Sequence, residues 1–277
     1  MYNSAAELER TMPDMDLGDV TIHYEEAGDG DPAFVYCHGL GGSGQGFEQN
    51  DMDWYAQHFR AVSWDNRGLG RSGQGQQYSL PLYASDLDRL LDGLDIARAV
   101  IFGVSWGGVL VQRFALDYPE RCAAIVVDSS SAAVNGAASD NWYQRGEVAR
   151  VGAEALAGRA LEPAFEGHVT VTEGDSREVA PEHLESYVAE SRAVAGLREH
   201  PLTPYLHRIE CPALIVAGGK DTVAGAGGSV QMARAIGDNA RLEIFQEAGH
   251  GVYAQDREKF RSLLLEFLTD HGLIAAG

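Results

Sequence analysis

Residues 99–108 have the sequence AVIFGVSWGG, and this segment decides how the middle of the chain folds. Ala99–Phe102 is a short, continuous apolar run, as expected for a strand that is covered on both faces. Glycines two residues before and two residues after Ser105 let the chain turn sharply at the serine. The amphipathic run Val109–Tyr118 then predicts a helix. The pattern therefore indicates a strand, a tight turn that exposes a hydroxyl, and a helix.

Similar apolar runs recur on both sides of this segment. Val20, Ile22 and Tyr24 alternate with polar residues, as in an antiparallel strand at the entry to a sheet. The parallel strands that the continuous runs predict are Phe34–Cys37, Ala61–Trp64, Ala99–Phe102, Ala123–Val127, Ala213–Ala217 and Leu242–Phe245. Helical patterns separate these strands, which predicts an α/β fold with a doubly wound, mostly parallel sheet. Such sheets bind ligands beyond the carboxyl ends of their strands.

The alternation of strand and helix stops between residues 129 and 205. Helix-like stretches such as Arg145–Ala160 and Pro181–Ala195 occur there with no clear strand between them. We therefore expect a helical lid at 129–205, inserted into an α/β core that residues 1–128 and 206–277 form. A chain of 277 residues with 45% hydrophobic content can bury one core of this size.

A serine hydroxyl needs a general base to become a nucleophile, and the base needs an acid that orients it. His250 lies in a glycine-flanked turn after the last predicted strand, which predicts that it is the base. Asp221 follows Ala213–Ala217, and the order Ser, Asp, His along the chain is one that serine hydrolases use. The competing acid is Asp128, at the end of its own strand. We predict a triad of Ser105, His250 and Asp221, with Asp128 as a strand-end cap.

The loop after the first predicted parallel strand is rich in glycine. Residues 38–44 have the sequence HGLGGSG, so the backbone there can approach a ligand closely. Acyl transfer places negative charge on an oxygen that fixed N–H groups must already face. We expect the N–H groups of Leu40 and Trp106 to be these donors. The loop has no Gly-Lys-Ser/Thr ending and no dinucleotide fingerprint, so it does not indicate a nucleotide.

Taken together, these motifs resemble the α/β-hydrolase superfamily over nearly the whole chain except the lid. Residues 65–72, with the sequence DNRGLGRS, are similar to the family's loop after the fourth strand, which supports the oxyanion loop. The resemblance implies the same triad and the same two oxyanion donors. Because a serine stands at position 105, the haloalkane dehalogenase and epoxide hydrolase branches, which have aspartate there, are excluded.

Resemblances within the superfamily point to acyl transfer. Residues 103–122 are similar to intracellular polyhydroxyalkanoate depolymerases, and residues 142–146 are similar to enol-lactonase-like hydrolases. A tryptophan directly after the serine, like Trp106 here, also occurs in proline iminopeptidases. Their HGGPG loop is absent, however, because residues 38–42 have the sequence HGLGG. We predict a serine hydrolase that cleaves carboxylic esters or lactones through an acyl-enzyme on Ser105. The alternatives are a proline-iminopeptidase-like aminopeptidase or a carbon–carbon bond hydrolase on the same triad, and a non-catalytic small-molecule receptor.

The partner predicted from composition is a small molecule. Trp142, Tyr143 and Phe165 in the lid are candidates to line an acyl pocket, or they pack between the lid helices. A net charge of −20 opposes binding to nucleic acid and to anionic lipid. No motif indicates a cofactor or a metal ion.

Cysteine usage and the apolar windows predict a cytoplasmic location. The three cysteines are widely separated in the sequence and form no CxxC pair, which argues against a disulfide framework and against a zinc knuckle. The first twenty residues lack the pattern of a signal peptide, and no apolar stretch is long enough to cross a bilayer.

Overall fold

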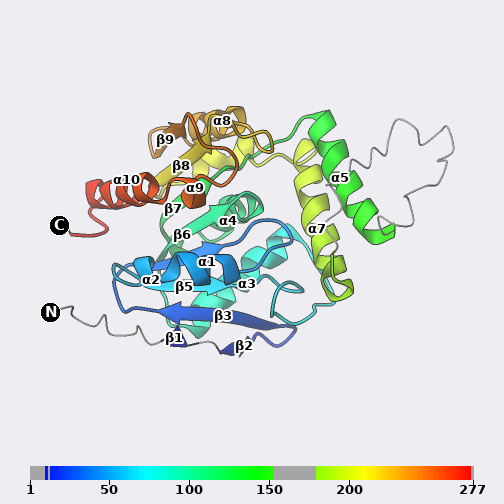
Figure 1. Ribbon diagram of the computed structural model, residues 1–277, viewed down its shortest axis with the longest axis horizontal. Coiled ribbons are helices and arrows are strands. Elements are labelled where there is room, and N and C mark those ends of the chain that lie inside the picture. Colours follow the sequence, from blue (N-terminus) through cyan, green and yellow to red (C-terminus); the bar gives the residue numbers. More distant parts are fainter. Residues whose placement is uncertain (1–9, 12, 152–178, 276–277) are drawn as a thin grey trace.

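A mostly parallel sheet runs through the middle of the molecule (Figure 1). The computed structural model describes residues 10–11, 13–151 and 179–275. Its strands are β1 (Arg10–Thr11), β2 (Asp14–Asp16), β3 (Thr21–Ala27), β4 (Ala33–Cys37), β5 (Arg60–Trp64), β6 (Ala99–Val104), β7 (Cys122–Asp128), β8 (Ala213–Gly218) and β9 (Ala240–Phe245). They lie in the order β1-β3-β5-β4-β6-β7-β8-β9, and β2 pairs with β3.

The direction of the strands confirms the predicted fold class. β3 is antiparallel to β1, β2 and β5, whereas every neighbouring pair from β5 through β4 to β9 is parallel. Each of the six apolar runs predicted as parallel strands lies in one of these strands, and the predicted entry strand is β3. The chain therefore has the doubly wound α/β sheet that its sequence indicates.

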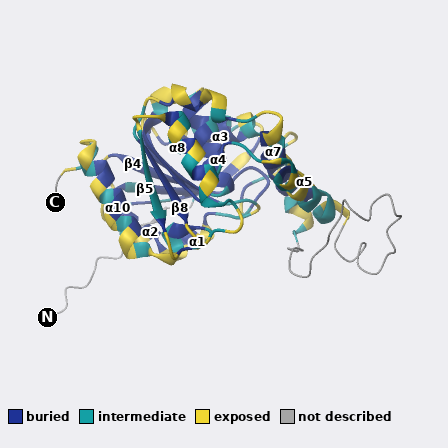
Figure 2. Cartoon of the chain, turned by 90° about the horizontal axis from the view of Figure 1, so that it is seen from above, coloured by how far each residue is buried: buried dark blue, intermediate teal, exposed yellow. Residues whose placement is uncertain are grey.

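Helices cover both faces of the sheet because its central strands are apolar on both faces. In β4, the side chain of Val35 packs into one core layer, and those of Phe34 and Tyr36 pack into the other. One layer is closed by α3 (Leu80–Gly93), α4 (Trp106–Asp117) and α8 (Ala226–Ile236). The other is closed by α1 (Gln45–Asn50), α2 (Met52–Tyr55), α9 (Val252–Gln255) and α10 (Arg257–Asp270). Figure 2 shows the strands as the buried centre of the molecule, with exposed residues on the outer sides of the helices.

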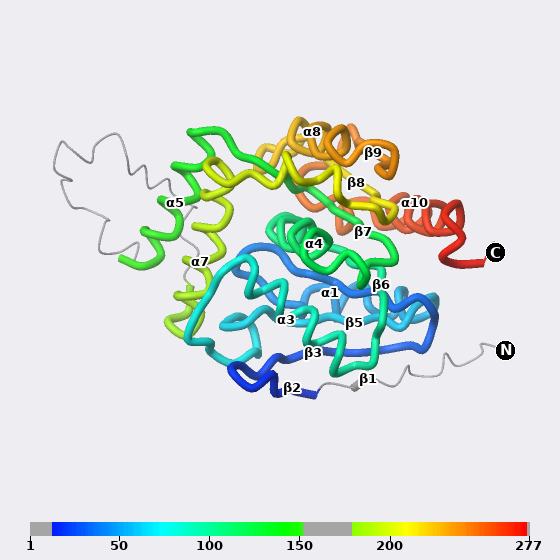
Figure 3. Tube along the Cα trace, turned by 180° about the vertical axis from the view of Figure 1, so that it is seen from behind, coloured from blue at the N-terminus to red at the C-terminus, as the bar shows by residue number. Residues whose placement is uncertain are grey.

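An insertion separates β7 from β8, and its described residues, 129–151 and 179–212, form two α-helices. These helices, α5 (Gly136–Val151) and α7 (Leu184–Ala195), pack against each other beyond one edge of the sheet domain (Figures 1 and 3). The hydroxyl of Ser139 in α5 donates to the carbonyl oxygen of Ala195 at 2.9 Å. Short 3-10 helices lie at Pro119–Arg121, Pro181–His183, Gly196–Arg198 and Thr203–Arg208. The boundaries of the predicted lid at residues 129 and 205 stay a prediction.

The first helix of the insertion begins earlier than expected. The sequence pattern predicts a helix at Arg145–Ala160, but α5 begins at Gly136. The reason is local, because the side-chain oxygen of Asn135 accepts from the N–H of Ala138 at 2.8 Å and so caps the first turn. Residues 152–160 lie outside the described part of the chain.

Two findings concern the state of the cysteines and the apolar character of the helices. All three cysteines are free thiols, and burial raises the pKa of Cys37 to about 12, which agrees with a packed thiol at the end of β4. Among the helices in the described ranges, none has both the length and the apolar character that a bilayer crossing needs.

Candidate active site

Ser105 lies at the sharp turn between β6 and α4. Its backbone has φ 56° and ψ −116°, which is a strained conformation for a residue other than glycine. A Cβ atom at Gly103 would collide with the carbonyl group of Gly107, and a Cβ at Gly107 would collide with the carbonyl oxygen of Cys37. Only glycines therefore permit this turn, which presents the hydroxyl at the start of a helix, where the helix dipole favours negative charge.

His250 and Asp221 form a hydrogen-bonded pair at the same edge of the sheet. The distance from His250 Nδ1 to Asp221 Oδ2 is 2.9 Å. The Asp221 side chain is 1% exposed, whereas that of His250 is 28% exposed. Burial alone would raise the pKa of Asp221, but hydrogen bonds from His250, Val223 and Ala224 lower it. An ionised carboxylate only accepts, so His250 donates from Nδ1 and leaves Nε2 free to accept a proton.

Asp128 binds the backbone just after His250. Its carboxylate accepts from the N–H groups of Val252 at 3.2 Å and Tyr253 at 2.9 Å, and from the hydroxyl of Ser129 at 2.8 Å. Burial raises the pKa of Asp128 to about 6. The competing acid thus lies at the N-terminus of α9, where its contacts are those of a cap and not of a partner for the imidazole ring.

The glycine-rich loop passes directly beside the serine. A Cβ atom at Gly39 would lie 3.8 Å from the Cβ of Ser105. Leu40 and Trp106 both line the cavity that opens at Ser105. Burial lowers the pKa of His38, and its ring is held between the carbonyl oxygen of Gly39 and a backbone N–H of the next loop. The structure thus brings the two predicted oxyanion residues to the predicted nucleophile.

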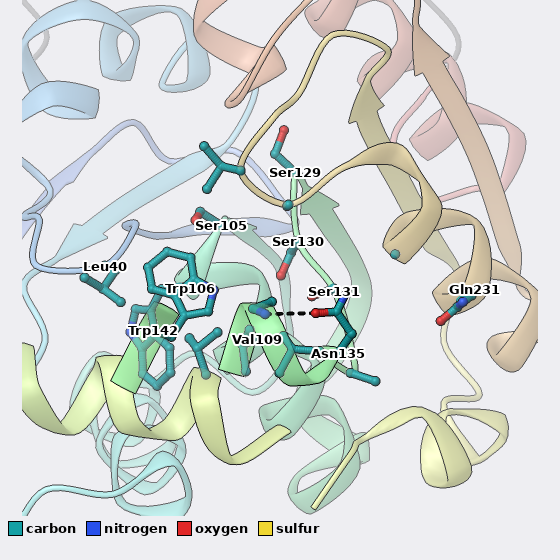
Figure 4. A pocket seen from close by; sticks show the side chains of 17 residues that line it. Leu40, Ser105, Trp106, Val109, Ser129, Ser130, Ser131, Asn135, Trp142 and Gln231 are labelled. Atoms are coloured by element: carbon teal, nitrogen blue, oxygen red, sulfur yellow. Dashed lines mark hydrogen bonds between the residues drawn. The ribbon is translucent and has the colours of Figure 1, made fainter. Parts of the chain in front are cut away.

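The cavity above Ser105 has a volume of about 410 Å³. Leu40, Trp106 and Trp142 lie on one side of it, and three consecutive serines, residues 129–131, lie on the other (Figure 4). Tyr143 is not among the residues that line it; its ring is 50% exposed and lies under the guanidinium of Arg192. Neighbouring residues of a helix point about 100° apart, and here Trp142 is the one that faces the cavity. Phe165 lies outside the described residues.

Comparison with known protein families identifies the family of this chain. A family model described as the alpha/beta hydrolase fold matches residues 32–256. The chain belongs to the α/β-hydrolase fold family. The match covers parts of both predicted segments of the core, and it includes every residue of the site described above.

Individual α/β hydrolases are similar to this chain at moderate identity. The 3-oxoadipate enol-lactonase 2 of Acinetobacter baylyi is 29% identical over 213 residues, which cover 74% of this chain and 78% of the lactonase. The 2-hydroxy-6-oxo-6-phenylhexa-2,4-dienoate hydrolase of Comamonas testosteroni is 27% identical over 277 residues, which cover 91% of this chain and 93% of that enzyme. The crystal structure of an enol-lactonase from Burkholderia xenovorans LB400 superimposes with a TM-score of 0.76 at 23% identity, and covers 93% of this chain and 100% of that one.

Sequence reasoning missed several residues of this α/β-hydrolase site. Ser129, Ser130 and Ser131 follow β7 directly, and the rule that ligands bind at the carboxyl ends of strands could have found them. Asn135 and Gln231 also line the cavity, but no local signal marks them. Within the described part of the chain, no group of His, Cys, Asp and Glu is arranged to hold a metal ion.

Proposed function

We propose that this α/β hydrolase cleaves carboxylic esters or lactones through an acyl-enzyme on Ser105. The observation that carries the proposal is the hydrogen bond between His250 and Asp221, at the edge of the sheet where the strained turn presents Ser105. The enol-lactonase of Acinetobacter baylyi supports it, as does a cavity large enough for a small ester. The three free thiols agree with a cytoplasmic enzyme, which we also propose.

The reaction takes two similar steps on this geometry. Nε2 of His250 accepts the hydroxyl proton while Ser105 Oγ attacks the carbonyl carbon, and Asp221 stabilises the imidazolium that forms. The backbone N–H groups of Leu40 and Trp106 receive the oxyanion. His250 then returns the proton to the leaving alkoxide or enolate, which gives the acyl-enzyme. In the second step a water molecule attacks the acyl carbon as the same ring takes its proton, and the ring then returns that proton to Ser105 Oγ as the acid is released.

Expulsion of an alkoxide or enolate needs less help than expulsion of an amine. Peptide cleavage also needs the substrate's chain to be held in register beside the nucleophile. We therefore expect good turnover of short and medium acyl esters and of lactones, and little or none of proline p-nitroanilide. Efficient cleavage of the anilide with weak ester turnover would instead identify an aminopeptidase.

The first experiment compares Ser105→Ala with wild type on p-nitrophenyl esters from acetate to decanoate and on several lactones. Ser105→Ala should lose nearly all turnover and remain folded, because the hydroxyl forms the covalent bond and contributes little to the core. Ser262→Ala, on the exposed side of α10, is the matched control and should keep full activity. A fluorophosphonate should label Ser105 in the wild type. Labelling at another serine, with Ser105 unmodified, contradicts the proposal.

Carbon–carbon bond hydrolysis is the second candidate, because the similar enzyme of Comamonas testosteroni is a 2-hydroxy-6-oxo-6-phenylhexa-2,4-dienoate hydrolase. The same triad can catalyse both reactions, so the substrate that is turned over distinguishes the two candidates. Loss of the dienoate absorbance with 2-hydroxy-6-oxo-6-phenylhexa-2,4-dienoate, at a kcat/KM above that of every ester, would favour this candidate. Tight binding without turnover of any substrate would favour a receptor.

A further inference from the structure

Helix α7 of the insertion is fixed to the core domain by buried polar groups. The hydroxyl of Ser186 donates to the carbonyl oxygen of Arg67 at 2.7 Å and lies 2.8 Å from the hydroxyl oxygen of Tyr83. Directly before α7, the partly buried His183 has its Nδ1 3.1 Å from the carbonyl oxygen of Gly68. Arg67 and Gly68 belong to the loop that supports the oxyanion loop, so α7 is docked next to the catalytic machinery.

Glu190 extends this docking to the oxyanion loop itself. Its side chain is 0% exposed, and Oε2 accepts from the N–H of Gly41 at 2.8 Å. Oε1 accepts from the side-chain amide of Asn66 at 2.8 Å. Burial raises the pKa of Glu190 to about 8, although these two hydrogen bonds and the side chain of Trp106 act to lower it. None of the catalytic steps proposed above uses this carboxyl group.

The hydrogen bonds around Leu40 fix two successive peptide planes. The carbonyl oxygen of Gly39 accepts from the N–H of Gly42 at 3.0 Å, and His38 Nδ1 lies 2.8 Å from it. These contacts orient the peptide between residues 39 and 40, whose N–H belongs to Leu40. Glu190, in α7 of the insertion, orients the next peptide, between residues 40 and 41, by accepting from the N–H of Gly41. The predicted oxyanion donor is thus held between a contact from the core and a contact from the insertion.

Asn66 and Gly41 join these contacts into one network. The backbone N–H of Asn66 donates to His38 Nε2 at 3.0 Å, while its side chain donates to Glu190. A side chain at Gly41 would collide with the ring of Tyr187, so α7 lies directly on the loop. Both supports of the oxyanion loop therefore meet at Asn66.

We propose that Glu190 is a positioning residue for the oxyanion hole: from the insertion it holds the Gly41 peptide, and with it the neighbouring Leu40 N–H, in the orientation that receives the oxyanion. The inference rests on the acyl-transfer function proposed above. Glu190 touches no reacting atom. The oxyanion hole is therefore complete only while α7 is docked on the core.

A pair of substitutions can exchange the donor and the acceptor in this network. Glu190→Gln keeps the shape of the side chain, and its amide oxygen can still accept from the N–H of Gly41. Its NH₂ group then faces the NH₂ group of Asn66, so two donors oppose each other. Asn66→Asp in the same chain replaces that facing donor with an acceptor and restores the negative charge of the pair. Ser186→Ala is the matched control, because it removes a buried contact of α7 with the core and leaves Gly41 untouched.

The assay measures kcat and KM for a p-nitrophenyl ester at about pH 9, above the pKa of about 8 of Glu190. Misplacement of a reacting or stabilising group by about 1 Å costs about a hundredfold in rate. We expect Glu190→Gln to lower kcat by about 10- to 100-fold with KM nearly unchanged, since the oxyanion exists only after the attack. The double variant should recover to within about threefold of wild type, and Ser186→Ala should remain within the same range.

Hydrogen exchange of the Gly41 amide, followed by NMR, gives a readout that needs no turnover. Exchange should be slow in wild type, faster in Glu190→Gln and slow again in the double variant. The positioning role is overturned if Gly41 exchange is unchanged in Glu190→Gln, if the double variant is no better than Glu190→Gln, or if Ser186→Ala loses as much kcat as Glu190→Gln. Absence of Ser105-dependent turnover in wild type would overturn the proposed function instead, whatever the exchange data show.

Discussion

The turn that carries His250 is held by side chains outside it, and these determine where its ring can lie. The hydroxyl of Ser129 accepts from the N–H of Gly251 at 3.0 Å, and the side-chain amide of Gln255 donates to the carbonyl oxygen of His250 at 2.6 Å. Asp128 binds the backbone that follows, and Asp221 binds the ring. One acid thus holds the backbone of the turn and the other orients the imidazole, so the two carboxylates should differ sharply when each is replaced.

Asp221→Asn should lower kcat by about 10³- to 10⁴-fold, because an amide favours the wrong tautomer of His250. Asp128→Asn should cost far less in kcat, since an amide oxygen still accepts from the N-terminus of α9. The measurement is kcat on p-nitrophenyl acetate for both variants, with circular dichroism to check folding. If Asp128→Asn is the more damaged variant, Asp128 and not Asp221 serves the histidine.

Sequence reasoning found Ser105, Asp221 and His250 as candidates because each follows a strand whose apolar run is visible locally. It named both Trp142 and Tyr143 as candidates, since which of them faces the cavity depends on how α5 is rotated about its axis. The role of Glu190 could not be predicted from the sequence, for a different reason. In a chain with 41 acidic residues, a glutamate on a helix is expected to face solvent, and only the fold shows that this one is buried on the oxyanion loop.

At the scale of elements, the strand–turn–helix unit of β6 and α4 depends on close backbone contact. Gly107 lies against the carbonyl oxygen of Cys37 at the end of β4, so this glycine sets how near the helix comes to the neighbouring strand. Strand positions were predictable because buried strands are apolar throughout. The start of α5 was not, because the cap at Asn135 is one polar residue among many.

Gly107→Ala should lower the free energy of unfolding by about 2–3 kcal/mol, because the added methyl group must displace backbone. Gly227→Ala is the control: it lies on the exposed side of α8 with open space around its Cα, and should raise the free energy of unfolding by about 0.5–1 kcal/mol. Urea unfolding of the two variants measures both values. Equal effects at the two positions would show that the turn tolerates a side chain.

For the whole molecule, buried carboxyl groups with raised pKa values link stability to pH. Glu190 has a pKa of about 8 in the folded chain, against 4.5 for an ordinary glutamate. Across this window the folded protein keeps a proton that the unfolded chain releases, so the free energy of unfolding falls as pH rises. Asp128 acts with the same sign up to its pKa of about 6.

Glu190→Gln removes one of these two groups and leaves the other. The difference in unfolding free energy between wild type and Glu190→Gln should therefore fall steadily from about pH 5 to about pH 8, while the contribution of Asp128 cancels. Guanidinium unfolding of both proteins at four pH values measures this difference. A difference that is constant over the range would mean that Glu190 titrates as an exposed glutamate does.

The insertion leaves the sheet after β7 and returns before β8, and these two strands are direct neighbours. Its two connections to the core therefore lie close together, and a different insertion could be grafted between them without altering the order of the strands. Such a graft would change the walls of the cavity and leave Ser105, Asp221 and His250 in place. The exchange is not free, however, because Glu190 leaves with the old insertion. A transplanted insertion that lacks its equivalent would bring new specificity together with a loosened oxyanion loop, so exchange of insertions within this family should succeed when this buried contact is transferred too.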